Sequence, residues 1–311
     1  MESSRVMLSR RRLLWFGGTG MGALALAGCR IERSSESRSS SPPIAVAGTP
    51  DPSIAPTGQT REYTLEAGEL AVELDGQQFT TWGYNGGLLG PEIRLKEGDT
   101  LRATVSNRLP ESTTIHWHGL PIPNRMDGVP NVTQPPIKPG TSFTYEFVAP
   151  VSGTFMYHTH VGLQLDRGLF GPLIIEPARE SLSYDQEFTL VLDDWLDGLP
   201  GTPDDAMRQL VAGGDRMMGG MSGMTGMGQM GGGPGTPPAE SPPDLVYPLY
   251  LINGKPGTAP QEVTVKRGDT VRLRLINPSA ATIYRVALAG HRLTVTHADG
   301  QPVEPVDVDV V

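Results

Sequence analysis

Two His-X-His pairs, His116-Trp117-His118 and His158-Thr159-His160, hold four of the six histidines of this chain. Side chains alternate between the two faces of a β-strand, so the histidines of one pair point the same way, about 7 Å apart. Neutral imidazole is a favoured ligand of copper and zinc. Two such pairs on adjacent strands would gather four ring nitrogens in one small volume. A single pair could be ordinary core or surface histidines, but two pairs of equal spacing predict a metal site.

The composition favours a turn-rich, all-β protein. The chain has 39 glycines and 29 prolines in 311 residues, and only 19% of its residues are charged. This length allows two domains of ordinary size. The net charge of −9, with no basic patch that interleaves aromatic residues, argues against a nucleic-acid partner.

Residues 1–28 have the pattern of a twin-arginine lipoprotein signal peptide. The stretch Ser9-Arg10-Arg11-Arg12-Leu13-Leu14 precedes an apolar run that is too short to span a bilayer comfortably. Leu26-Ala27-Gly28-Cys29 resembles a bacterial lipobox, in which Cys29 would carry the lipid; the alternative is an ordinary signal peptide with a stray cysteine. We expect an exported, extracytoplasmic protein, anchored as a lipoprotein to the outer face of the cytoplasmic membrane.

Residues 29–60, rich in Ser, Pro, Ala and Gly, read as a flexible tether. Because Cys29 is the only cysteine, we expect no intrachain disulfide and no thiolate metal ligand downstream.

Short strand-like runs separated by turn signals indicate a first β-sandwich domain over residues 61–178. The runs are Glu62–Leu65, Leu70–Leu74, Glu92–Leu95, Thr100–Asn107, Thr114–His118, Ser142–Phe147, Gly153–His158 and Pro172–Glu176.

An internal repeat defines a second domain over residues 179–311. The stretch 92–102 reappears in register at 262–272, and Asn107 reappears as Asn277, 170 positions on. The copy has Tyr284 and Val286 where the first domain has its first histidine pair, so we expect it to be a structural spacer. It is also shorter after the repeated asparagine, so we expect the second sandwich to be incomplete. His291 and His297 lack the paired spacing and are interpreted as surface or turn residues.

A Gly/Pro-rich insert, at about 199–243, carries six closely spaced methionines. Thioethers are soft ligands that suit Cu(I), so the insert predicts metal capture; the alternative is a low-complexity loop whose methionines do nothing specific. The methionines are Met217, Met218, Met221, Met224, Met227 and Met230.

Four motifs in this order resemble the multicopper oxidases, in particular their laccase-like and copper-tolerance branch. The motifs are His116-Trp117-His118-Gly119-Leu120, Asp127-Gly128-Val129-Pro130, the stretch 153–160, and Gln164 followed by Gly168-Leu169-Phe170-Gly171. The resemblance covers the chain from about Arg61 to its end. It implies tandem cupredoxin-like Greek-key β-sandwiches, the second of them incomplete here.

In that family three cupredoxin domains hold four copper ions. A type 1 copper takes electrons from a reducing substrate, such as a phenol or a metal ion like Cu(I), and a trinuclear cluster passes four of them to O2, giving water. By matching position, His116 would bind the type 2 copper, and His118, His158 and His160 would bind the type 3 pair. Asp127 matches a carboxylate that assists proton delivery, although it could equally be part of an ordinary Asp-Gly turn.

The chain departs from this pattern because it lacks the type 1 cysteine and the four further histidines that the cluster needs. We therefore expect it to supply half of the trinuclear ligands, to need a third cupredoxin domain or another chain, and to be inactive alone. A non-catalytic copper-binding or copper-buffering lipoprotein is the alternative. A copper nitrite reductase is disfavoured, because its first domain would contain a type 1 cysteine.

Overall fold

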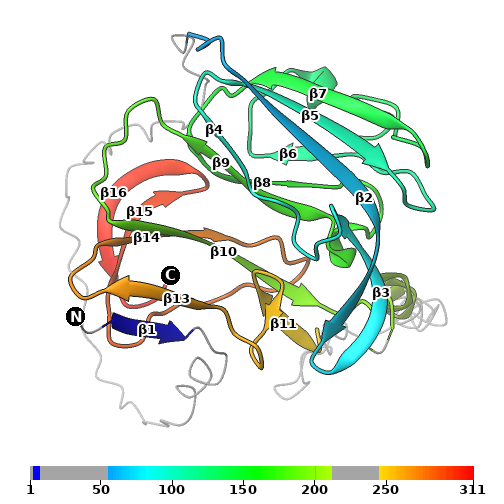
Figure 1. Cartoon of the computed structure of the whole chain (residues 1–311). Coiled ribbons are helices and arrows are strands. Elements are labelled where there is room, and N and C mark those ends of the chain that lie inside the picture. Colours follow the sequence, from blue (N-terminus) through cyan, green and yellow to red (C-terminus); the bar gives the residue numbers. More distant parts are fainter. Residues whose placement is uncertain (1–2, 8–54, 200, 212–244) are drawn as a thin grey trace, which may run out of the picture.

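The computed structural model describes the backbone of residues 3–7 and residues 55–199, 201–211 and 245–311 in full. Its first half is a sandwich of two four-stranded sheets (Figure 1). One sheet has the spatial order β3 (Gln77–Tyr84), β2 (Thr60–Leu74), β5 (Thr100–Asn107), β7 (Ser142–Val148). The other has the order β4 (Ile93–Lys96), β9 (Phe170–Glu176), β8 (Gly153–His158), β6 (His116–His118).

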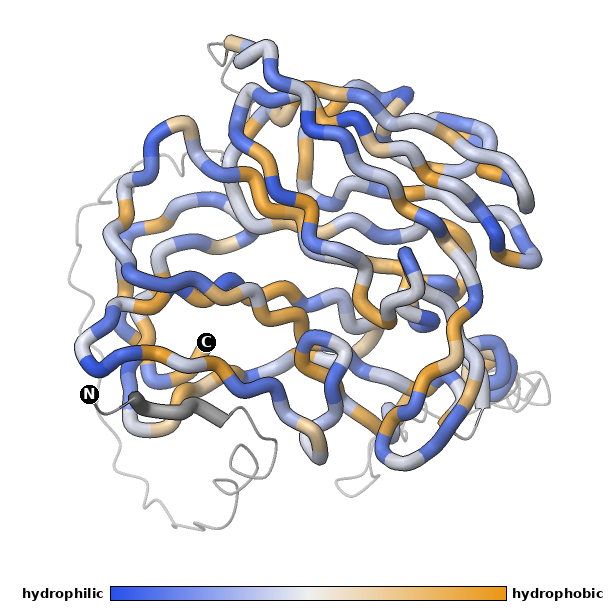
Figure 2. The backbone as a smooth tube through the Cα atoms, in the orientation of Figure 1, coloured by the Kyte–Doolittle hydropathy of each residue, from blue (hydrophilic) through white to orange (hydrophobic). Residues whose placement is uncertain are grey.

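Apolar residues alternate with polar ones along most strands of this sandwich, as the hydropathy colours of Figure 2 show, whereas β9 is buried along almost its whole length. Leu101, Ala103 and Val105 of β5 are fully buried against Trp117 and Tyr157 from the opposite sheet. The predicted all-β sandwich is therefore confirmed. Its sequence-derived strand bounds need correction, because the two predicted runs at 62–65 and 70–74 form the single strand β2 and because β3 was not predicted.

The second half contains a sheet in the order β12 (Lys255–Pro256), β11 (Leu249–Ile252), β10 (Gln186–Trp195), β14 (Val271–Ile276). Strand β13 (Glu262–Lys266) pairs with β1 (Ser3–Met7), and β15 (Leu293–Ala298) forms a hairpin with β16 (Gln301–Val308). Strand β10 runs parallel to β14 and antiparallel to β11, as β2 runs parallel to β5 and antiparallel to β3. The repeated sequence thus has a repeated topology.

The repeat extends to single hydrogen bonds. The Asp99 carboxylate accepts from the backbone N–H of Lys96 at 3.2 Å, and Asp269 accepts from Lys266 at 2.9 Å. The Asn107 and Asn277 side chains each accept from the backbone N–H two residues on, at 2.9 and 3.1 Å. The same turn chemistry therefore ends corresponding strands in both halves.

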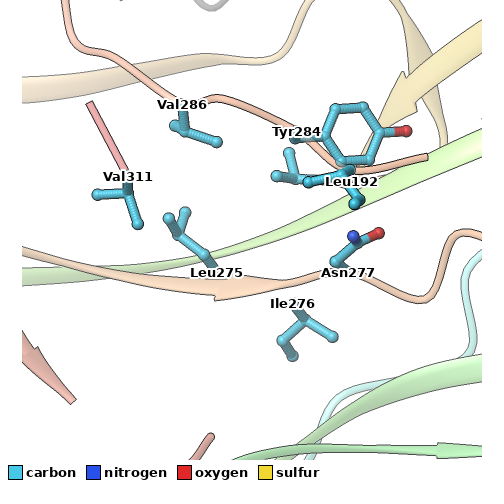
Figure 3. Close-up of a pocket in the computed structure, with 8 residues that line it drawn as sticks. Leu192, Leu275, Ile276, Asn277, Tyr284, Val286 and Val311 are labelled. Atoms are coloured by element: carbon cyan, nitrogen blue, oxygen red, sulfur yellow. The ribbon is translucent and has the colours of Figure 1, made fainter. Parts of the chain in front are cut away.

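In the described part of the second half, the residues of the sheet are less buried than the corresponding residues of the first half. The β14 residues Val271, Leu273 and Leu275, which correspond to the fully buried Leu101, Ala103 and Val105, are only half-buried. An apolar pocket of about 170 Å³ opens beside Leu275 (Figure 3). Its other lining residues are Leu192, Ile276, Asn277, Ile283, Tyr284, Val286 and Val311.

Apolar packing and a hydrogen bond from a buried arginine join the two halves. Phe170 of β9 packs with Val191 and Ile276 of β10 and β14 in one buried cluster. Arg274, a residue that is 3% exposed, donates to the Thr154 hydroxyl of β8 at 2.7 Å, and it pairs with Glu187 of its own sheet at 2.8 Å. Strand β8 is therefore held from the second half as well as from its own sheet.

One unpredicted helical segment, at 203–211, lies inside the insert expected at 199–243. The Thr202 hydroxyl accepts from the Asp205 N–H at 3.2 Å, and the Asp205 carboxylate accepts from the Thr202 N–H at 2.9 Å, which is a reciprocal N-terminal cap. No helix in the described part of the chain is long and apolar enough to cross a bilayer. Cys29, the tether up to residue 54 and the six methionines at 217–230 lie outside the described residues.

Candidate metal centre

Strands β6 and β8 place the histidine pairs side by side at one edge of the sheet β4-β9-β8-β6 in the first half of the molecule. They pair antiparallel, with His116 directly opposite His158 and Trp117 opposite Tyr157. Cross-strand partners share a face of the sheet, so both imidazoles point out of the sandwich while Trp117 and Tyr157 fill its core. Trp117 is fully buried and belongs to the core. His118 lies two residues further along the same face, and His160 follows the end of β8.

The imidazoles converge on one small volume. One nitrogen of each of His116, His118 and His158 lies within 4.8 Å of the other two. His118 Nδ1 is 3.2 Å from His158 Nε2. Two nitrogens that each bind one ion at about 2.0 Å, at a tetrahedral angle, stand about 3.3 Å apart. The spacing of this pair therefore matches two ligands of a single ion.

His160 lies beside this group. Its ring centroid is 5.3 Å from that of His116 and 5.9 Å from that of His158. The structure thus brings all four predicted histidines together, three of them tightly and His160 at the exposed margin.

Backbone carbonyls fix the tautomers of two of these rings. His116 Nδ1 donates to the Asp127 carbonyl at 2.8 Å, and His158 Nδ1 donates to the Thr159 carbonyl at 2.6 Å. A carbonyl oxygen can only accept, so Nδ1 carries the proton in both rings and Nε2 keeps its lone pair. Metal-binding histidines are held by such contacts in other proteins.

Burial keeps two of the four imidazoles, His118 and His158, in the neutral form. Burial lowers the pKa of His158 to about 4, and the nearby His116, His118 and His160 rings add to this effect. Burial also lowers the pKa of His118, against the opposing influence of the Asp299 carboxylate. Both rings are therefore unprotonated at neutral pH, which is the form that binds metal.

Asp127 reaches His116 in two ways. Besides its carbonyl, its carboxylate Oδ1 lies 3.3 Å from His116 Nδ1. Gly128 makes this approach possible, because its φ is +83° and a Cβ there would lie 1.7 Å from the Ile115 carbonyl oxygen. Asp127 ends the short 3₁₀ turn η2 (Asn124–Met126), so it is part of a turn and a neighbour of a predicted ligand at once.

The other two histidines of the chain make unrelated local contacts. His291 is exposed and its Nδ1 hydrogen-bonds to the Ala289 carbonyl at 3.1 Å, while His297 lies half-buried on β15. Sequence reasoning missed Asp299, which lies in the turn between β15 and β16 and acts on His118 from the other half of the molecule. The Asp299-Gly300 dipeptide was a turn signal, but nothing local linked it to the histidines.

The sequence matches two family models, both described as multicopper oxidase, over residues 66–180 and 187–311. This chain belongs to the multicopper oxidase family. The family predicted from the motifs is therefore confirmed, and so is its fold of cupredoxin β-sandwiches. Copper is the metal expected for the family, and the convergent, neutral imidazoles fit it.

Curated relatives of this multicopper oxidase chain include bacterial copper proteins. It is 38% identical to multicopper oxidase MmcO of Mycobacterium tuberculosis over 259 residues. This aligned stretch covers 82% of this chain and 50% of MmcO. It is 36% identical over 287 residues to copper resistance protein A of Pseudomonas syringae pv. tomato, covering 86% and 46%. The chain thus spans about half the length of the curated relatives it matches.

Solved structures agree on the fold. The laccase of Botrytis aclada matches with a TM-score of 0.63 and 30% identity, over 83% of this chain and 45% of that one. The blue copper oxidase of Nitrosomonas europaea matches with a TM-score of 0.60 and 30% identity, over 81% and 72%.

Proposed function

We propose that this chain is part of an enzyme that oxidises a phenolic or metal-ion substrate and couples the oxidation to four-electron reduction of O2 to water. The observation that carries the proposal is the convergence of His116, His118 and His158, whose ring nitrogens lie within 4.8 Å of one another on adjacent strands. Copper supplies one-electron redox chemistry when it is bound, and imidazole is among its preferred ligands.

The finer assignment gives each residue one role. His116 would bind a type 2 copper, and His118, His158 and His160 would bind a type 3 pair. The backbone carbonyls of Asp127 and Thr159 hold the protons of His116 and His158 on Nδ1, so each Nε2 carries the lone pair that a metal would bind. Asp127 would carry protons between solvent and the site, since its side chain is 29% exposed and its carboxylate lies 3.3 Å from a ligand ring.

We further propose that four histidines are half of a trinuclear ligand set, completed by a third cupredoxin domain or another chain. The 311 residues contain one cysteine and two histidines outside the pairs, too few for a type 1 site and the rest of the cluster. On this proposal the chain alone shows no intense thiolate-to-copper absorption band and no turnover of phenols. The N-terminal pattern supports export and a lipid anchor at Cys29.

A copper-buffering lipoprotein is the second candidate. The exposure of His118 and His160 favours it, because solvent can reach the site for ion exchange. The methionines at 217–230 would then hold Cu(I), and no electron transfer to O2 would occur. A His-Cys-His segment in the completing polypeptide, with O2 consumed in the presence of a phenol, would favour the oxidase over the buffer.

The test is copper stoichiometry with electron paramagnetic resonance on the 311-residue chain. We expect the wild type to bind Cu²⁺ with nitrogen hyperfine structure, and the double variant His116→Ala, His158→Ala to lose that signal. The matched control is His291→Ala, His297→Ala, which removes as many imidazoles away from the cluster and should bind as the wild type does. Equal loss in both double variants would contradict the site.

A further inference from the structure

Gln164 lies buried beneath the second histidine pair, with 1% of its surface exposed. Its Oε1 accepts from the hydroxyls of Thr113 and Thr159, each at 2.8 Å. Its Nε2 donates to the Glu111 carboxylate at 2.9 Å and to the Ser112 carbonyl at 2.8 Å. The carbonyl can only accept, which fixes the orientation of the amide, and all four of its hydrogen-bonding positions are used.

The two threonines that share Oε1 belong to the two histidine segments. Thr113 begins the segment that enters β6, three residues before His116, and its backbone N–H donates to the Ile137 carbonyl at 3.0 Å. Thr159 is the middle residue of the second pair. Their hydroxyl oxygens are 3.2 Å apart. One side-chain oxygen therefore joins the two chain segments that carry the predicted ligands.

Thr159 is held at each of its polar atoms. Its N–H donates to the Leu169 carbonyl at 3.0 Å, and its hydroxyl accepts from the Val161 N–H at 3.2 Å besides donating to Gln164. Its carbonyl oxygen, fixed in this way, accepts from His158 Nδ1. The path from the Gln164 amide to a ligand ring thus runs through a single residue.

We infer that Gln164 is a positioning residue that sets the separation and orientation of the two histidine pairs, and so tunes copper affinity and geometry. The inference rests on the proposed function, because it assumes that the histidines bind copper. A buried amide that merely satisfies neighbouring polar groups would affect stability alone. Partners behind metal ligands typically change metal affinity by about 10–100-fold when they are removed.

The experiment uses the 311-residue chain, with Cu²⁺ affinity measured by competition against a chelator and the copper spectrum by electron paramagnetic resonance. Gln164→Met keeps the length of the side chain but removes its hydrogen bonds. Thr159→Val removes the connecting hydroxyl, whereas Thr159→Ser keeps it. Val105→Ala, in the core of the opposite sheet, is the control that destabilises the sandwich without touching the network.

We expect Gln164→Met and Thr159→Val to weaken copper binding about 10–100-fold and to change the copper hyperfine pattern, at a temperature where both remain folded. Thr159→Ser and Val105→Ala should keep wild-type affinity within about twofold and the wild-type spectrum. Wild-type affinity and spectrum in Gln164→Met would overturn the inference while leaving the proposed function intact. If the wild type did not bind Cu²⁺ through the histidine pairs, that result would instead contradict the proposed function.

Discussion

The copper-free chain should lose stability as the pH falls from 6.5 to 4 because of His158. Burial lowers the pKa of this ring to about 4, against 6.5 in an exposed histidine. Between these two pH values the His158 ring binds a proton in the unfolded chain but not in the folded chain, so a fall in pH favours unfolding. The free energy of unfolding is therefore greatest above pH 6.5. The difference between the pKa values of the unfolded and folded chain corresponds to about 3 kcal/mol of unfolding free energy. Well below pH 4 both states bind the proton, so His158 causes no further loss of stability.

The assay is denaturant unfolding of the copper-free chain at pH 7.5 and 4.5. Other groups titrate in this range with the opposite sign: burial raises the pKa of Asp166 to about 6, which favours the folded state as the pH falls. The informative quantity is therefore the difference between wild type and His158→Gln. The wild type should lose about 2–3 kcal/mol more than this variant. The control His291→Gln removes an exposed ring and should keep the wild-type pH dependence.

The reasoning would be refuted by equal pH dependence in wild type and His158→Gln. That result would mean that the ring is hydrated in the folded chain and that burial does not keep it neutral. Saturating copper should flatten the dependence in the wild type, since a bound ion competes with the proton for the ring nitrogen.

Three further predictions concern the support of the site. Gly128→Ala should cost about 1–3 kcal/mol from backbone strain alone and also weaken copper binding, because the added methyl meets the Ile115 carbonyl; a thermal melt with a copper titration checks this, and unchanged values in both would contradict it. Trp117→Ala should destabilise the chain by about 3–5 kcal/mol in denaturant unfolding, and a loss below about 1 kcal/mol would show that the ring is not core. Arg274→Met should lower the free energy of unfolding by about 1–3 kcal/mol, because it removes the hydrogen bond to Thr154 across the two halves and leaves Glu187 with Arg94 as its close partner; a neutral outcome by the same method would argue against that contact.

Local pattern predicts those elements whose signals are local. Strand β8 has its predicted bounds, because an alternating run between a glycine and a histidine pair leaves little choice. The missed strand β3 follows an Asp75-Gly76 turn with positive φ at both residues, a hairpin signal present in the sequence. The helical segment at 203–211 was hidden by the Gly/Pro-rich composition around it, although Thr202 and Asp205 have the spacing of a cap.

The site was predictable in its residue types but not in its distances. The equal spacing of the two pairs indicated convergence, yet the register that puts His116 opposite His158 depends on pairing between residues 42 positions apart in the sequence. The prediction for Asp127 concerned its carboxylate, whereas its shorter contact with His116 is made by its backbone carbonyl. Asp299 lies 181 positions from His118, and only the folded arrangement of both halves brings it near.

Gly153, at the start of β8, packs against the turn between β15 and β16. A Cβ at Gly153 would lie 2.4 Å from the Gly300 carbonyl oxygen, so the backbones of the two halves approach closely here, and the Phe155 ring packs against both glycines. Close-packed contacts of this kind transmit displacement instead of absorbing it. The strand that ends in His158 therefore cannot shift along its axis unless the neighbouring hairpin shifts too, and the alignment of the imidazoles is a joint property of both sandwiches.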